Sequence, residues 1–93
     1  MSPLKLFEYM AAGRAIVATH FPVFDEILRD QKNCQLVEAD NAQSLHQGLT
    51  SVLDNAVFRE KIGQQAYEDV QGYSWTSRVQ FILDHKKLSL TNN

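Results

Sequence analysis

The stretch SPLKLFEYMAAGRAIVAT, residues 2–19, predicts a helix that is followed directly by a strand. Ser2 can cap the helix, and Pro3 suits its first position, where a missing N–H costs no helical hydrogen bond. Gly13 stands where a left-handed residue ends many helices, so the helix should span Pro3–Ala12. The short run Ala15–Thr19 contains β-branched residues and does not alternate, which is typical of a strand covered on both faces in a parallel sheet.

The rest of the chain predicts a second strand and further helices. Val23–Arg29 has the pattern of a short helix, Cys34–Val37 that of a strand, and Asp40 or Asn41 can cap the next helix. Two more helices follow, the last of them capped by Ser74. The residues expected to face the core are Leu4, Leu6, Phe7, Met10, Ala11, Phe24, Ile27, Leu28, Ala42, Leu45, Leu49, Val52, Leu53, Phe58, Ile62, Ala66, Val70, Val79, Ile82, Leu83 and, as a core anchor, Trp75.

This order of elements predicts an α/β fold with two short parallel strands and about five helices. Helix and strand alternate at the front of the chain, and parallel strands need a crossover between them. Two strands do not make an independent doubly wound sheet. We therefore expect the chain to belong to a larger sheet, or its open strand edges to pair with another chain.

Composition excludes several classes of protein. The chain has 93 residues and a formal net charge of −2, with no run of like charges and no basic face for nucleic acid. The single cysteine, Cys34, excludes an intrachain disulfide and a multi-thiolate metal site, and it favours a cytoplasmic location. We expect no metal and no cofactor. No apolar run is long enough for a transmembrane helix, and Glu8 lies where a signal peptide needs an apolar stretch.

The opening stretch resembles a signature of the retaining glycosyltransferases of group 1, family 4, which have the GT-B fold. Members carry the pattern P-x-K-x-x-E-x-M-A-x-G-x-P-[IV]-V-A-[ST] in their C-terminal half. Glu26, Leu36-Val37 and Tyr73-Ser74-Trp75 fit later parts of the family pattern. The resemblance covers roughly residues 2–88, and the residues that match the signature itself are Pro3, Lys5, Glu8, Met10, Ala11, Gly13, Ile16, Val17 and Ala18.

The sequence departs from the family in three places. Ala15 replaces a usual proline, and Gln31, Lys32 and Cys34 replace a glycine-rich turn. The family motif has two glutamates separated by seven residues; Glu8 matches the second, and the first would lie one position ahead of the first methionine. The resemblance therefore implies a C-terminal fragment of a Rossmann-like, nucleotide-sugar-binding domain at residues 1–88. The composition of residues 89–93 predicts a flexible tail.

The resemblance implies that Ser2, Pro3, Leu4, Lys5 and Glu8 bind the donor, a nucleotide-diphosphate sugar. A helix N-terminus offers unpaired N–H groups to a diphosphate, and a carboxylate can accept both hydroxyl hydrogens of a ribose. From the residues alone, a capped helix start with an exposed glutamate is the simpler interpretation. No catalytic residue is assigned. His20 follows the first strand, at the carboxyl end where α/β sheets bind ligands, although an exposed loop histidine explains it as well.

Two functions stay open at this point. The first is a piece of a glycosyltransferase that, when intact, transfers a sugar from the donor to an acceptor with retention; the fragment alone is expected to be inactive, because the acceptor domain is missing. The second is a non-catalytic half-domain that self-associates, as a homodimer. Peripheral membrane association is expected only through the missing N-terminal domain.

Overall fold

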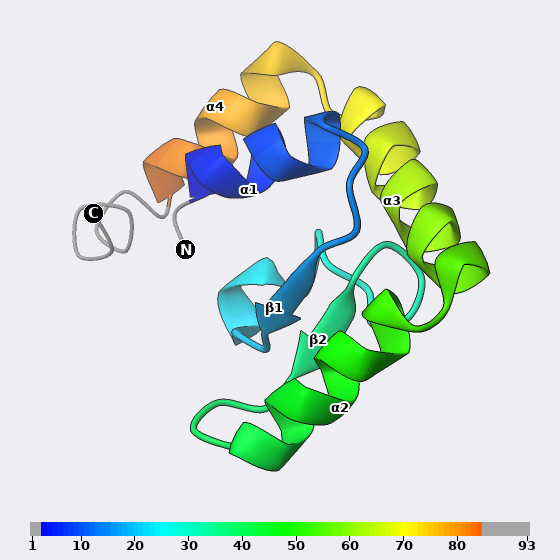
Figure 1. Cartoon of the computed structure of the whole chain (residues 1–93). Coiled ribbons are helices and arrows are strands. Elements are labelled where there is room, and N and C mark those ends of the chain that lie inside the picture. Colours follow the sequence, from blue (N-terminus) through cyan, green and yellow to red (C-terminus); the bar gives the residue numbers. More distant parts are fainter. Residues whose placement is uncertain (1–2, 85–93) are drawn as a thin grey trace.

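Two parallel strands and four α-helices make up residues 3–84, the part of the chain that the computed structural model describes (Figure 1). This arrangement confirms the predicted α/β class. The expected site residue Ser2 and the tail at 89–93 lie outside the described residues. The elements in chain order are α1 (Pro3–Ala11), β1 (Val17–Thr19), the 3-10 helix η1 (Pro22–Phe24), β2 (Gln35–Val37), α2 (Ala42–Leu53), α3 (Ala56–Gln71) and α4 (Trp75–Asp84).

The sheet consists of β1 and β2, paired in parallel with Ala18 opposite Leu36. The pairing confirms the predicted topology, although both strands are shorter than expected. Helix α2 packs against the two strands and runs alongside β2 (Figure 1). It approaches closely because Gly48 has no side chain; a Cβ there would collide with the side chain of Val37. Within residues 3–84 each strand has one edge with no neighbouring strand.

The crossover between the strands is not the α-helix predicted for Val23–Arg29. It is the 3-10 helix η1 followed by a turn, in which the N–H of Leu28 donates to Phe24 O at 2.8 Å. The side chain of Asn33 explains the difference. Its amide donates to Ile27 O at 2.9 Å and its carbonyl accepts from Arg29 N at 2.8 Å, so it takes the backbone groups that a longer helix would use. The inward positions predicted for Phe24, Ile27 and Leu28 are confirmed.

The core lies between α1, α3, α4 and the crossover. Helix α1 buries Leu6, Phe7 and Met10, whereas Leu4 and Ala11, which were predicted to face inward, are exposed. On α3 the predicted face is confirmed, with Ile62, Ala66 and Val70 fully buried and Phe58 half-buried. The sequence analysis did not select Phe81, yet it is the centre of an aromatic cluster in which its ring lies 5.8 Å from Phe7 and 6.2 Å from Phe24.

Two apolar stripes that were predicted to be buried are only partly so: Val52 of α2 and Ile82 of α4 pack inward, whereas most of the other members are exposed. On α2 the residues that pack inward are Gly48 and Val52, so the α2 leucine stripe, Leu45, Leu49 and Leu53, faces outward. The helix turns this way because Gly48 permits the closest approach to the sheet.

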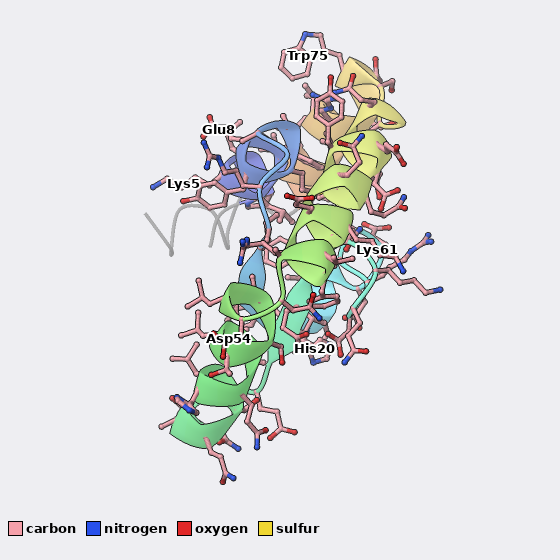
Figure 2. All side chains as sticks on the ribbon, turned by 45° about the vertical axis from the view of Figure 1, so that its right-hand side comes forward. Lys5, Glu8, His20, Asp54, Lys61 and Trp75 are labelled. Atoms are coloured by element: carbon pink, nitrogen blue, oxygen red, sulfur yellow. The ribbon has the colours of Figure 1, made fainter. Side chains whose placement is uncertain are left out.

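On α4 the prediction for Trp75 as a core anchor is wrong. Its side chain is 73% exposed, and Val79 and Leu83 are exposed beside it, because α4 directs Phe81 into the core instead. The guanidinium of Arg78 lies 5.7 Å from the Trp75 ring centroid and donates to Val70 O at 2.7 Å, at the end of α3. Trp75 therefore packs over this cation on the surface (Figure 2).

Three predicted helix boundaries are confirmed. Gly13, two residues after the end of α1, has a φ of +69°, which is the left-handed conformation expected at a helix end. The side chain of Asn41 accepts from Ser44 N at 2.9 Å at the start of α2, and the hydroxyl of Ser74 accepts from Ser77 N at 3.0 Å at the start of α4. Each of these two side chains satisfies a helix N–H that has no partner within the helix.

Candidate functional site

Lys5 and Glu8 lie on the solvent face of α1 (Figure 2). They are three positions apart, so their side chains leave the helix on the same side. The opposite side of α1 is held in place by the buried side chains of Leu6, Phe7 and Met10. The packing of the helix thus determines where this exposed cation and carboxylate lie.

The first turn of α1 combines these side chains with the positive end of the helix dipole. Pro3 is buried and anchors the start of the helix, while Leu4 is exposed. Backbone N–H groups in the first turn of an α-helix have no partner within the helix, and the helix dipole makes this end positive. Leu4 and Lys5 supply such N–H groups, whereas Pro3 has none. The structure thus brings together Pro3, Leu4, Lys5 and Glu8 of the predicted site, and it leaves their role as a prediction.

The carboxyl ends of β1 and β2 form a second region, where the His20 ring Nε2 lies 2.8 Å from the carboxylate Oδ1 of Asp25. Both side chains are half exposed or more. A neighbouring hollow of 440 Å³ is lined by Thr19 and Val37 of the strands and by Glu38, Asp40 and Asn41 before α2. His20 lies far from Lys5 and Glu8 in Figure 2, so it does not belong to the α1 site. The exposed-loop interpretation of His20 fits its position.

The buried thiol of Cys34 is not a nucleophile. Burial raises its pKa to about 12, the negative charge of Asp30 adds to this effect, and a backbone hydrogen bond with Arg29 opposes it. The thiol therefore stays protonated near neutral pH and packs as a small apolar group, as predicted. Burial also raises the pKa of Tyr73, and the negative charge of Glu26 raises it further. The Tyr73 hydroxyl donates a hydrogen bond to Glu26 O at 3.2 Å.

Residues 3–84 hold neither a cluster of metal ligands nor a helix that could span a membrane. These residues contain no group of three or more His, Cys, Asp or Glu side chains arranged to hold a metal ion. No helix within the same range has both the length and the apolar composition that crossing a membrane requires.

Sequence reasoning missed a polar group inside the core. Asn33 is fully buried, and its amide donates to the carboxylate Oδ2 of Asp69 on α3 at 2.8 Å. It sits in a turn whose other residues are polar and exposed, so nothing in the local pattern distinguishes it. Sequence reasoning also missed a cleft, in which the turn brings Arg29 and Lys32 close to Lys61 of α3.

Comparison with known proteins identifies the family of the chain. The family of group 1 glycosyl transferases matches residues 2–69. The chain belongs to this family. The match includes α1 with Lys5 and Glu8, and it ends within α3, before Tyr73 and α4. The resemblance expected from the opening stretch is thereby confirmed.

Several curated group 1 glycosyl transferases are similar to the chain. Phosphatidyl-myo-inositol mannosyltransferase of Mycobacterium tuberculosis is 39% identical over 77 residues, which covers 78% of this chain and 20% of that protein. The enzyme of the same name from Mycobacterium leprae is 37% identical over 73 residues, with the same coverage. The chain thus spans about a fifth of the length of these relatives. No solved structure matches it significantly.

Proposed function

We propose that this chain supplies part of the donor-binding half of a glycosyltransferase that uses a nucleotide-diphosphate sugar and retains the anomeric configuration. The observation that carries the proposal is the outward placement of Lys5 and Glu8 on α1, within the segment that matches the family. The names of the relatives, which are mannosyltransferases, favour mannose as the transferred sugar.

The two side chains suit different parts of the donor. The carboxylate of Glu8 can accept hydrogen bonds from both ribose hydroxyls, since an ionised carboxylate has several acceptor sites. The ammonium group of Lys5 supplies a point charge for the diphosphate. The positive end of the helix dipole lies at the same turn and favours an anion there.

The chain alone is proposed to bind nucleotide without transferring sugar. Transfer requires donor and acceptor to be held together in a reactive geometry, and the segment covers only a fifth of its relatives. Amide NMR titrations with GDP, UDP and ADP test the binding. The expected result is saturable shifts at Leu4 and Lys5 that weaken in Glu8→Gln but persist in Glu60→Gln, an exposed control on α3. Sugar transfer by the purified chain, or equal binding by the two variants, would contradict the proposal.

A second proposal is that the isolated chain forms a homodimer through the α2 leucine stripe. All three leucines are exposed, Leu53 to 66%, and within residues 3–84 each strand of the sheet has one edge with no neighbouring strand. Ile16 and Val37 are buried and do not contribute. Exposed apolar side chains in a contiguous group are typical of an interface, and a twofold pair is the commonest arrangement.

Sedimentation of the chain at tens of micromolar tests the dimer. We expect a species of twice the chain mass, and dissociation in the double variant Leu45→Ser with Leu49→Ser. Tyr67→Ser removes an exposed aromatic side chain from α3 and serves as the control, which should stay dimeric. A monomer at these concentrations would contradict the proposal.

A cytoplasmic location, and membrane association only through a further domain, also stay predictions.

A further inference from the structure

A cleft with three cationic side chains lies between the turn before β2 and helix α3. Its volume is 260 Å³, and Arg29, Gln31 and Lys32 of the turn face Lys61, Gln65 and Asp69 of α3 across it. It adjoins the amino end of β2, the opposite end of the sheet from His20. Figure 2 shows Lys61 on the other side of the molecule from Lys5 and Glu8. The cleft is therefore separate from the proposed donor site.

The turn that carries Arg29 and Lys32 is held in one conformation. Lys32 N donates to Arg29 O at 3.1 Å, and Gln31 N donates to Cys34 O at 2.7 Å. The buried side chain of Asn33 joins this turn to α3 through Asp69, at 2.8 Å. Because the turn is fixed to the helix that forms the opposite wall, the backbone positions of Arg29, Lys32 and Lys61 are set relative to one another, and only their side chains have to be ordered on binding.

The charge in the cleft is positive. Three cations face one carboxylate, that of Asp69, whose oxygens accept from Asn33 at 2.8 Å and from Gln65 at 2.9 Å. Within residues 3–84, none of Arg29, Lys32 and Lys61 forms an ion pair. An otherwise acidic chain thus concentrates unpaired cations at one concave place. Cations that share a cleft repel one another, and an anion bound between them offsets this repulsion.

We propose that this cleft binds a phosphate group, at a site distinct from the donor site on α1. A guanidinium can bind two phosphate oxygens at once, and the two ammonium groups add point charges. The amides of Gln31 and Gln65 offer further donors to the remaining oxygens. The concave shape and the small volume suit a phosphate on a small molecule better than the flat surface of a membrane.

Amide NMR of the chain, titrated with inorganic phosphate at constant ionic strength set with sodium chloride, tests the site. The expected result is saturable shifts at residues 29–33, 61 and 65. The double variant Arg29→Gln with Lys61→Gln should weaken this binding by about tenfold or more, because it removes two charge-assisted contacts. Arg14→Gln, which removes an exposed cation elsewhere, should leave it unchanged. The dispersion of the spectra shows whether each variant is folded.

Three results would overturn the site. The first is the absence of saturable shifts at residues 29–33, and the second is equal binding by the double variant and the wild type. The third is association of the chain with phosphatidylglycerol-containing vesicles that depends on Arg29 and Lys61, without any response to free phosphate; that result would identify a membrane surface instead. Shifts at Leu4 and Lys5 report the donor site in the same spectra, so either site can fail while the other stands.

Discussion

The side chains of Asn33 and Asp69 are joined by a 2.8 Å hydrogen bond, although they lie 36 residues apart in the chain. Asn33 is fully buried and also bonds Ile27 O and Arg29 N, so one amide links the crossover, the turn before β2 and helix α3. Both polar atoms of the Asn33 side chain, the amide nitrogen and the carbonyl oxygen, are therefore hydrogen-bonded. The same hydrogen bond determines how the proposed phosphate cleft is assembled, because Asp69 lies in its wall.

Replacing Asn33 with alanine should lower the free energy of unfolding by about 2–3 kcal/mol, because buried polar groups lose their partners. Ile27 O and Arg29 N would remain without the bonds that Asn33 makes. Urea denaturation measures the change. Gln65→Ala is the matched control, since it removes an exposed hydrogen bond to the other oxygen of the same carboxylate, and its effect should stay within about 0.5 kcal/mol. Equal losses in the two variants would contradict the role given to Asn33.

Replacing Gln31 with glycine should stabilise the protein. Gln31 has a φ of +63°, a left-handed conformation that costs a residue with a side chain about 1–2 kcal/mol. Glycine relieves this cost but adds freedom to the unfolded chain, so the net gain should be about 0.5–1 kcal/mol. Thermal and urea unfolding measure it. Lys32→Gly, at the next position and outside the left-handed region, should destabilise instead; a loss in Gln31→Gly would show that the turn is not strained.

Replacing Gly63 with alanine should destabilise the protein, even though alanine favours a helix by about 1 kcal/mol. A Cβ at position 63 would lie 2.6 Å from Gly13 O and 3.1 Å from the carbonyl carbon of Arg14. Helix α3 must then move away from the link between α1 and β1, at a cost of about 1–3 kcal/mol. Denaturation experiments give the change, and Gln64→Ala, at an exposed neighbouring position of α3, should be neutral. A stabilised Gly63→Ala variant would show that this contact is loose.

The buried face of a helix can be predicted from the sequence when only one of its faces is apolar. The spacing of Ile62, Ala66 and Val70 selects a single face of α3, and that face is buried. The spacing fails on α2, whose stripe of leucines lies beside a glycine. The small size of Gly48, and not the hydrophobicity of Leu45 or Leu49, decides which side of α2 meets the sheet. Periodicity measures hydrophobicity and does not measure how closely two backbones can approach.

The candidate site was partly predictable for a similar reason. Lys5 and Glu8 lie on one helix, so their common face follows from local spacing and the resemblance gives it a role. The cleft joins Arg29 and Lys32 to Lys61, which is separated from them by β2 and α2. Its formation depends on the hydrogen bond between Asn33 and Asp69, a long-range contact that no local pattern in the sequence encodes.

The thiol of Cys34 should make the protein less stable as the pH rises from 9 to 12. Its pKa is raised from 9.0 to about 12, chiefly by burial. Between these two values the unfolded chain releases the proton while the folded chain keeps it, so the unfolded state is favoured more as the pH rises. Below pH 9 both states keep the proton and the contribution is constant. Urea denaturation across this range measures the slope of the free energy of unfolding against pH, which should be reduced in Cys34→Ala.

A thiol reagent at pH 8 should also react slowly with the native protein and rapidly with the unfolded one. Rapid labelling of the native protein, or an unchanged slope in Cys34→Ala, would show that the thiol is not protected by burial.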